Sequence, residues 1–193
     1  MSRPKNKQKT AKIYRVIAHL FAHKGYHSTS MREIAREVGM NQSSLYHYFA
    51  SKEDILFTLM NDAMDNVLAT LEKISAASRS PEEKLRDVLG FYTKYYAGDQ
   101  ERLTLLVNEI NSLNDEYRLT LVQKQRRYVH LIESILRELA GQGRMKRINP
   151  AVATFAFFGM VHYTIKWYHR DGPVSPDELA ELFVEIFTKG ILR

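Results

Sequence analysis

A short run of polar and aromatic side chains, residues 41–48, is the part of the chain best suited to specific binding. Its amide, hydroxyl and imidazole groups can form hydrogen bonds, and it contains no carboxylate that phosphates would repel. Leu45 and Phe49 are apolar and one helical turn apart, so they can anchor one side of a short helix. The other side is small, polar and aromatic: Gln42, Ser43, Ser44, Tyr46 and His47. Such a face suits the major groove of DNA.

The flanking residues predict a helix-turn-helix around this run. Asn41 is a good N-cap for the short helix, and Gly39 breaks the helix before it. That earlier helix begins at Ser30, which with Glu33 has the pattern of a capping box. Its apolar positions recur at helical spacing: Met31, Ile34, Ala35 and Val38. Residues 30–52 therefore predict two short helices joined by a tight turn.

Longer helices are predicted on either side of this pair. Apolar residues at i, i+3, i+4, i+7 and i+8 indicate a helix over about 7–23 that stops at Gly25. After the pair, Ser51 caps a long helix over about 51–77, with Asp54 at its third position. Because this helix begins where the second short helix ends, we expect it to connect the binding segment mechanically to the rest of the chain.

Positive charge is concentrated at the N-terminal end. Residues 1–52 contain ten Lys or Arg against two acids, a net charge of +8, whereas the remaining residues contain eighteen against twenty, a net charge of −2. This asymmetry predicts a polyanionic partner for the first segment only, with a solvated basic tail as the alternative. Five cations form a basic arm that we expect to be flexible and to touch the DNA backbone or minor groove: Arg3, Lys5, Lys7, Lys9 and Lys12.

The rest of the chain predicts further helices and no strand. They cover about residues 81–97, 100–112, 115–139, 151–165 and the segment from 175 onward. We therefore predict an all-α chain of about nine helices, with a helix-turn-helix domain over 1–52 and a second helical domain over 53–193.

One of these helices is apolar on almost every side. It covers residues 151–165, which is too short to span a bilayer. A helix without a polar face must be covered all round, so we expect one side to pack within its own chain and another against a second copy.

Several other kinds of chemistry find no support in the sequence. There are no cysteines, which excludes disulfides and thiolate metal sites and fits a reducing cytoplasm. The N-terminal segment has no apolar region of the kind found in signal peptides. His19 and His23 are four residues apart and could ligate a metal, but no HExxH pattern or further ligand is evident, so we interpret them as solvated histidines. Catalytic residues, a metal and a cofactor are therefore not predicted.

With these residues in view, the chain resembles the tetracycline-repressor (TetR) family of one-component transcriptional regulators. The resemblance is detailed over about the first quarter of the chain and rests on helix number and length beyond it. The matching residues stand in the order and spacing of that family's DNA-binding domain: Phe21, Gly25, Tyr26, Ser28, Thr29, Ile34, Ala35, Val38, Gly39, Leu45, Tyr46, Tyr48, Phe49, Lys52 and Leu56.

The resemblance implies a set of DNA-binding residues. Asn41, Gln42, Ser43 and His47 correspond to positions nearest the bases, while Ser30, Tyr46 and Lys52 correspond to phosphate contacts. The full set is Ser30, Arg32, Asn41, Gln42, Ser43, Ser44, Tyr46, His47 and Lys52. By contrast, we expect Tyr48 and Phe49 to be core aromatics.

For the second domain, the resemblance implies a dimer interface and a ligand cavity. The last two helices would pair with their counterparts in a four-helix interface through Phe157, Met160, Val161, Thr164, Leu179, Leu182, Phe183, Ile186 and Phe187. The residues expected to line the cavity are Phe91, Tyr92, Tyr95, Asn108, Phe155, Phe158, His162, Tyr163 and Trp167. The same aromatic residues can also be interpreted as ordinary core.

The closing segment from Lys166 resembles that of TetR-type regulators which respond to fatty-acyl or other acyl-CoA thioesters. Cations that could meet the CoA phosphates are Arg118, Lys124, Arg126, Arg127, Lys166 and Arg170. The resemblance thus implies a homodimeric repressor that binds a pseudo-palindromic operator and is released by a small molecule. The alternatives are a different hydrophobic or aromatic effector, as in multidrug-efflux regulators, and a helical partner-binding module.

Overall fold

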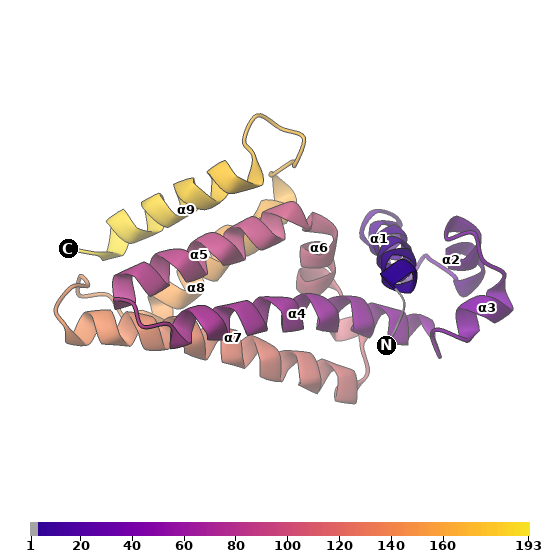
Figure 1. The fold of residues 1–193 in the computed structure, drawn as a ribbon, viewed down its shortest axis with the longest axis horizontal. Helices are drawn as coiled ribbons and strands as arrows, with labels where there is room; N and C mark the ends of the chain where they lie inside the picture. The colour runs from indigo at the N-terminus through magenta and orange to yellow at the C-terminus, as the bar shows by residue number, and fades with distance from the viewer. Residues whose placement is uncertain (1–3) are drawn as a thin grey trace. The chain divides into compact units, whose positions relative to one another are not determined.

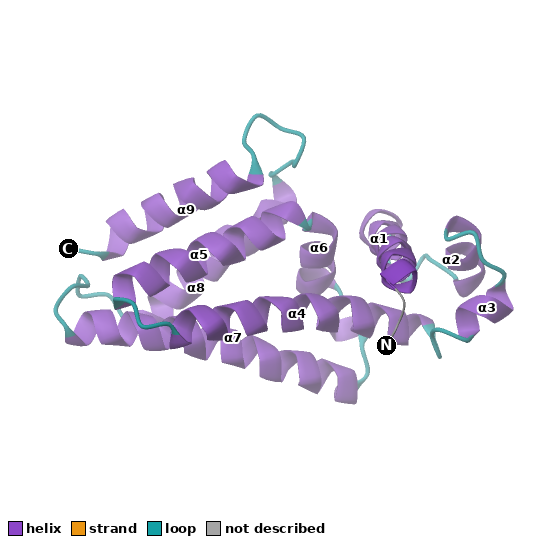
Figure 2. Ribbon diagram, in the orientation of Figure 1, coloured by secondary structure: helices purple, strands orange, loops and turns teal. Residues whose placement is uncertain are grey.

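The structure is a computed structural model that describes the backbone of residues 4–193 and the side chains of residues 11–193. Over these residues the chain forms nine α-helices, two short 3-10 helices and no β-strand (Figure 1, Figure 2). The predicted all-α class is confirmed. The elements are α1 (Pro4–Lys24), α2 (Met31–Glu37), α3 (Gln42–Tyr46), α4 (Lys52–Ala76), α5 (Pro81–Gly98), α6 (Gln100–Asn108), η1 (Ile110–Ser112), α7 (Asp115–Gly141), α8 (Pro150–His162), η2 (Tyr163–Lys166) and α9 (Pro176–Ile191).

The largest difference from prediction lies at the start of α1. The helix begins at Pro4, so the backbone expected to form a flexible arm is helical from that residue onward. Proline suits a first helical turn because its fixed φ is already helical and the N–H it lacks would have no partner there. Arg3 and the side chains of Lys5, Lys7 and Lys9 lie outside the described residues.

The chain divides into two compact units. The first combines the chain up to Ala63 with Glu101–Leu119, and the second combines Met64–Gln100 with Thr120–Arg193. Helices α4 and α7 therefore each contribute residues to both units. The domain boundary after Lys52 stays a prediction, because compactness alone does not define a folding domain.

Buried apolar side chains hold the first unit together. Ile17 and Phe21 of α1, Ile34 of α2 and Leu45 of α3 are almost fully buried. The turn between α2 and α3 passes through Gly39, whose φ of 69° is in the left-handed region that favours glycine. The anchors predicted from spacing are therefore core residues, and a glycine ends α2 where one was expected.

The segment from α6 to the start of α7 is fastened into the first unit by side chains. Phe57 stacks on Tyr117 with ring centroids 4.1 Å apart, and the His27 ring nitrogen lies 3.0 Å from the Ser112 hydroxyl. The Glu53 carboxylate accepts a hydrogen bond from the backbone N–H of Asn114. These contacts join residues that are about 60 to 85 positions apart in the chain, and they belong to the same unit as α3.

In the second unit, α5 packs along α9 and also against α8 (Figure 1). Helix α5 begins with a complete capping box: the Ser80 hydroxyl accepts from the Glu83 N–H, and the Glu83 carboxylate accepts from the Ser80 N–H. Helix α8 is capped by Asn149, whose side chain accepts from the Ala151 N–H at 2.9 Å. Sequence signals therefore mark both helix starts.

The end of the chain is tied back onto the loop that follows α7. Met145 and Leu192 form an isolated antiparallel bridge. The Lys146 ammonium donates to the carbonyl oxygens of Lys189 and Gly190, both at 3.1 Å. Orphan carbonyls at the end of α9 are thereby satisfied.

The apolar helix α8 contains 13 residues. Within residues 4–193, no helix combines the length and the hydrophobicity needed to cross a bilayer.

Substituting Ser80→Ala removes the hydroxyl half of the α5 capping box. Loss of such a cap costs about 1 kcal/mol of folding free energy, so the variant should unfold at lower urea concentration with an unchanged dependence on urea. The matched control is Ser78→Ala, at an exposed serine two residues earlier, which should unfold as wild type does. Equal effects of the two substitutions would contradict the cap assignment.

Candidate DNA interface and effector region

Helix α3 presents the predicted polar face to solvent. Gln42, Ser43, Tyr46 and His47 are exposed, while Leu45 is fully buried. Because Leu45 turns inward, residues on the opposite side of this short helix must turn outward. The arrangement provides amide, hydroxyl and imidazole groups on one surface, as base and phosphate contacts require.

Two of the predicted contact residues also serve as helix caps. The Asn41 side-chain oxygen accepts a hydrogen bond from the Ser44 N–H at 2.7 Å, and the Ser30 hydroxyl accepts from the Glu33 N–H at 3.2 Å. Asn41 therefore has its amide N–H groups left as donors toward a base edge, since its oxygen is engaged in the cap.

The Glu33 carboxylate of the capping box predicted at Ser30 is shared with another helix. It pairs with Lys24 of α1, and a hydrogen bond with the Ser30 backbone also contributes to its environment. The hydrogen bond from Lys24 lowers the pKa of Glu33 below its ordinary value. Sequence spacing could not reveal this competition, because the cation comes from another helix.

A shallow cleft of about 560 Å³ lies beside the start of α2 and includes predicted contact residues. Its lining residues are Lys24, Ser30, Arg32, Glu33 and Arg36. Glu33 pairs with Lys24, and Arg36 bonds to Glu37. The exposed Arg32 side chain is available here to meet a phosphate.

In addition to its predicted phosphate contact, Lys52 forms hydrogen bonds that stabilise the first unit. Its ammonium donates to the carbonyl oxygens of Tyr26 and Thr29, both at 2.9 Å, and lies 4.3 Å from the centroid of the Tyr26 ring. Two of its three N–H donors are thus used inside the protein, which leaves one for a phosphate.

The prediction that Tyr48 is a core residue is wrong. Its side chain is 56% exposed, whereas its neighbour Phe49 is only 6% exposed. The Phe49 N–H still bonds to the Leu45 carbonyl oxygen at 3.1 Å, so Phe49 follows Leu45 inward at helical spacing and Tyr48 turns toward solvent. Tyr48 is therefore a candidate DNA contact that sequence reasoning missed.

An aromatic cluster occupies the interior of the second unit around Tyr92. The Tyr92 ring lies 4.8 Å from Tyr96, 5.3 Å from Phe158 and 5.7 Å from Phe157, measured between ring centroids. Its hydroxyl lies 2.9 Å from Nε2 of His162, and the His162 tautomer decides which group donates. Burial raises the pKa of Tyr92 and lowers that of His162 to about 4, so both groups are neutral near pH 7.

The structure brings only part of the predicted ligand-binding set into this cluster. Tyr92, Phe158 and His162 meet there, and Phe91 packs beside Tyr95. Asn108 lies on an exposed side of α6 and belongs to the first unit. Three others are largely exposed, at 62%, 66% and 48% respectively: Phe155, Tyr163 and Trp167. These four are therefore not part of the buried cluster.

Most of the predicted dimer-interface residues are buried within their own chain. The buried ones are Phe157, Val161, Thr164, Leu179, Phe183 and Phe187, while Met160 is half-buried. A side chain enclosed by its own chain cannot offer surface to a second copy without rearrangement, so we revise these assignments. Leu182 and Ile186 of α9 remain exposed, as an interface requires.

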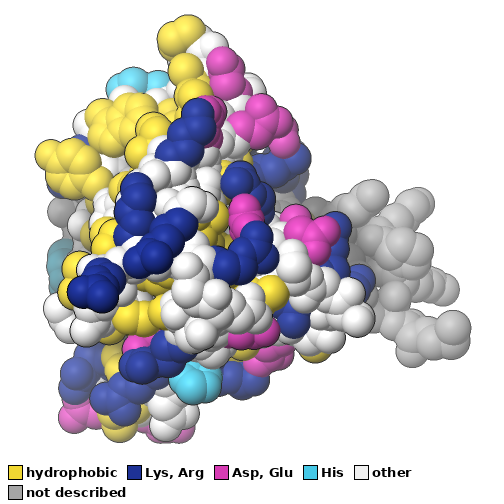
Figure 3. All heavy atoms as spheres, turned by 90° about the vertical axis from the view of Figure 1, so that its left-hand side faces the viewer, with side chains coloured by type: hydrophobic (Ala, Val, Ile, Leu, Met, Phe, Trp, Pro, Cys, Tyr) yellow, Lys and Arg dark blue, Asp and Glu magenta, His cyan; other side chains and the backbone are white. Residues whose placement is uncertain are grey.

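The exposed apolar residues of α8 differ from those predicted for the dimer interface. Val152 and Phe155 of α8, and Tyr163 at the start of η2, are more than 60% exposed. Because α8 is apolar on every side, helical periodicity cannot distinguish its inner from its outer face. Figure 3 shows hydrophobic side chains gathered in the upper left of the face that it draws.

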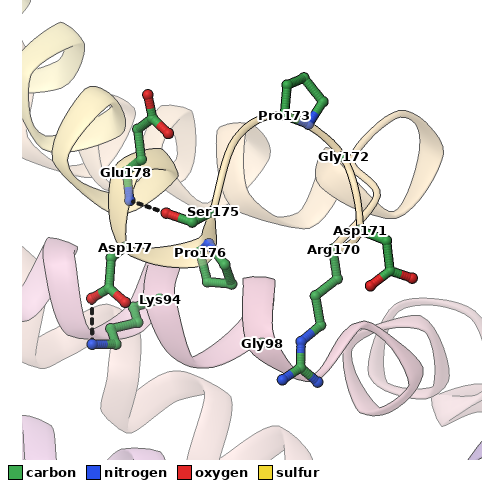
Figure 4. Close-up of a pocket in the computed structure, with 10 residues that line it drawn as sticks. All are labelled: Lys94, Gly98, Arg170, Asp171, Gly172, Pro173, Ser175, Pro176, Asp177 and Glu178. Atoms are coloured by element: carbon green, nitrogen blue, oxygen red, sulfur yellow. Dashed lines mark hydrogen bonds and ion pairs between the residues drawn. The ribbon is translucent and has the colours of Figure 1, made fainter.

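A polar pocket of about 520 Å³ opens beside the loop before α9 (Figure 4). Lys94 forms an ion pair with Asp177, and the Arg170 side chain extends alongside Gly98. Ser175 caps α9 by accepting from the Glu178 N–H at 3.2 Å. Arg170 is one of the cations predicted to meet CoA phosphates, and this pocket is where the structure places it.

Several of the other predicted phosphate-binding cations already have acidic partners. Lys124 pairs with Asp65, and Arg127 pairs with Glu72. Arg118 pairs with Asp115 and belongs to the first unit. Arg126 and Lys166, like Arg170, have exposed side chains.

Comparisons with known proteins agree with this architecture. Residues 13–59 match the family described as "Bacterial regulatory proteins, tetR family", and residues 78–191 match "Tetracyclin repressor-like, C-terminal domain". The chain is 26% identical over 190 residues to the fatty acid metabolism regulator protein of Bacillus subtilis (strain 168), covering 96% of this chain and 98% of the relative.

Solved structures give the same picture. A TetR-family transcriptional regulator from Bordetella parapertussis 12822 is 32% identical with a TM-score of 0.82, and 92% of each chain is covered. The structure of AibR in complex with isovaleryl coenzyme A and operator DNA is 28% identical with a TM-score of 0.80, covering 92% of this chain and 97% of AibR. The chain therefore belongs to the TetR family of transcriptional regulators, as the resemblance indicated.

The roles of α3 residues can be separated by substitution. Gln42→Ala should change base preference at one operator position, because a bidentate amide contact is worth about 1–3 kcal/mol of discrimination. Tyr46→Phe should weaken binding to all sequences by roughly tenfold, because it removes a phosphate hydrogen bond without removing the ring. Selection from randomised DNA followed by fluorescence anisotropy measures both effects.

The matched control for these variants is Gln125→Ala, in the second unit, which should leave DNA binding unchanged. A uniform loss of affinity from Gln42→Ala, with no change in preference, would contradict the division between base and phosphate contacts.

The buried imidazole of His162 makes stability depend on pH. Its pKa in the folded chain, about 4, is below the ordinary value of 6.5, so the unfolded chain binds more protons between these values. The free energy of unfolding should therefore be fully retained above about pH 6.5 and fall as pH decreases toward about pH 4. His162→Gln should flatten this decline in urea titrations at pH 7 and pH 5, because glutamine does not titrate.

The exposed His130 provides the control for this experiment. His130→Gln should retain the decline of the wild-type protein. If His162→Gln and wild type lose equal stability over this range, the proton-linked role of His162 is excluded.

Proposed function

We propose that this chain is a homodimeric transcriptional repressor that binds a pseudo-palindromic operator and leaves it when an acyl-CoA thioester binds. The observation that carries the DNA-binding part is the outer face of α3, where Gln42, Ser43, Tyr46 and His47 are exposed above a buried Leu45. This face offers direct hydrogen-bonding groups, and its helix is anchored in the core of the first unit.

In this proposal, base and phosphate contacts are divided along the helix-turn-helix. Gln42, Ser43, His47 and the amide N–H groups of Asn41 face base edges. Ser30, Arg32, Ser44, Tyr46 and the remaining Lys52 donor hold the phosphate backbone, and Tyr48 joins them as an exposed aromatic residue. The excess positive charge of residues 1–52 strengthens this association through counterion release.

Dimerisation would use the apolar side chains that α8 and α9 leave exposed. This surface is supplied by Val152 and Phe155 of α8, Tyr163 of η2, and Leu182 and Ile186 of α9. Apolar side chains of this size are stabilised by removal from water, so contact with a second copy is favourable. Two α3 helices in a dimer then match the two halves of a symmetric operator.

The effector would bind in the second unit, against the aromatic cluster around Tyr92. An acyl chain requires apolar walls, which Phe158 and Tyr95 provide, and a thioester carbonyl requires a polar partner. The Tyr92–His162 pair is such a partner, because either neutral group can offer a hydrogen bond after rotation. AibR, whose structure contains isovaleryl coenzyme A, supports an acyl-CoA as the effector class.

The CoA phosphates would then contact exposed cations of the second unit. Arg170 lines a pocket whose volume, about 520 Å³, lies within the range of small-molecule sites. Arg126 and Lys166 are further exposed cations of the second unit. The acids Asp171 and Glu178 also line that pocket, so phosphate binding there depends on Arg170 outweighing their repulsion.

Release from DNA requires that effector binding change the positions of the two α3 helices in the dimer. Helix α4 is continuous from Lys52 to Ala76 and contributes to both compact units. We propose that acyl-CoA binding displaces the second-unit part of α4, and that Lys52 carries the displacement to the loop it bonds. Repression itself would follow from occupancy of promoter DNA in the cytoplasm.

A panel of acyl-CoA thioesters of different chain lengths tests the effector. At least one should bind the full-length protein in isothermal titration calorimetry and lower its affinity for operator DNA. CoA without an acyl group should bind at least about tenfold more weakly. Arg170→Ala should weaken acyl-CoA binding but leave binding of the corresponding free fatty acid unchanged.

Failure of every thioester to bind would overturn the effector class without affecting the proposed DNA binding. A second candidate, a hydrophobic or aromatic compound unrelated to CoA, is favoured by the aromatic cluster alone. In that case the operator complex would dissociate with such a compound, and Arg170→Ala would have no effect.

A further inference from the structure

We propose that His19, His23 and Glu101 form a binding site for a divalent transition-metal ion, with Zn²⁺ as the ion best suited to it. The two histidines stand on α1, and Glu101 lies in the first turn of α6. All three belong to the first compact unit. The site is separate from the outer face of α3 and does not depend on the proposed repressor function.

The geometry gathers three ligand atoms at one place. His19 and His23 are four residues apart on one helix, so their rings share a face, and the ring centroids are 4.2 Å apart. Glu101 approaches from the other helix, with Oε1 3.6 Å from Nδ1 of His19. One ligand atom from each of the three residues lies within 4.8 Å of the others.

These separations are close to those of a bound zinc ion. Bonds of about 2.0–2.2 Å at tetrahedral angles place neighbouring donor atoms roughly 3.3–3.5 Å apart. The separation between His19 and Glu101 is already near this range. Because both histidines are exposed, modest side-chain rotations can close the wider separation without disturbing the core.

The donor set selects the class of ion. Two imidazole nitrogens and one carboxylate oxygen match zinc and its neighbours in the first transition row, whereas Ca²⁺ and Mg²⁺ favour sites made of oxygen alone. Three protein ligands leave a fourth tetrahedral position, which water can occupy because the histidines face solvent.

The position of Glu101 is set by packing as well as by its contact with His19. Leu103, Leu105 and Leu106 of the same helix are buried, and the segment that follows is fastened by the His27–Ser112 and Phe57–Tyr117 contacts. The third ligand is therefore held near the histidine pair before any metal arrives, which reduces the entropy lost on binding. A bound ion would add a link between α1 and α6.

The simplest alternative is an ordinary ion pair between His19 and Glu101, which requires a protonated imidazole. Such an ion pair does not involve His23. Metal binding requires neutral imidazoles and needs all three side chains. Dependence on His23 therefore separates the two interpretations.

The test uses full-length protein without an affinity tag, stripped with EDTA and titrated with ZnCl₂ in a calorimeter. We expect one Zn²⁺ per chain in the micromolar range or tighter, and a loss of at least about tenfold in affinity for each of His19→Gln, His23→Gln and Glu101→Gln. Zn²⁺ should also raise the Tm of the wild-type protein, and Mg²⁺ should not.

His130→Gln is the matched control, since His130 is an exposed histidine of the second unit and lies outside the cluster of His19, His23 and Glu101. It should bind Zn²⁺ as wild type does. Far-UV circular dichroism checks that every variant is folded. The Tm of each variant without metal is the reference for its Tm with Zn²⁺. Absence of stoichiometric Zn²⁺ binding by the wild type, wild-type affinity in His23→Gln, or an equal loss in His130→Gln would each overturn the site.

Discussion

The ammonium group of Lys52 fixes the arrangement of helices in the first compact unit. It bonds to the carbonyl oxygens of Tyr26 and Thr29 and lies over the Tyr26 ring. These carbonyls belong to the loop between α1 and α2, while Lys52 is the first residue of α4. One side chain thus sets the spacing of three helices within the first unit. Without this cation, two partly buried carbonyl oxygens would lose their charged donor, a costly change for backbone polar groups.

In the second unit, polar groups lie among buried aromatic rings and therefore need hydrogen-bond partners. The Tyr128 hydroxyl donates to the Met64 carbonyl oxygen at 2.6 Å, and the Tyr92 hydroxyl meets His162. Burial without such partners would cost several times the strength of one net hydrogen bond. These bonds therefore position the rings more narrowly than apolar packing alone, and they leave polar groups inside an otherwise apolar interior.

Much of the fold follows from local rules, and the discrepancies have common physical causes. Asn41 identifies the start of α3 because capping depends on neighbours within one turn. Leu45 and Phe49 identify its inner side because they lie one helical turn apart. The outer side of α8 could not be found in this way, since an evenly apolar helix has no preferred face. Glu101 could not be joined to His19 and His23, and Lys52 could not be joined to Tyr26, because both depend on segments brought together only by folding. The prediction for Tyr48 is wrong because helical spacing from the buried Leu45 turns Phe49 inward and leaves Tyr48 exposed.

The exposure of the α3 face also bears on how such a protein can change over evolutionary time. Leu45 anchors the helix from the inside, while the side chains of Gln42, Ser43 and His47 reach into solvent. Replacements at exposed positions of this kind usually alter stability by less than about 0.5 kcal/mol. In the base-reading role that we propose for these residues, mutations at these positions would change the recognised DNA sequence with almost no selection from folding. A lineage that keeps one scaffold can in this way acquire new sets of target genes.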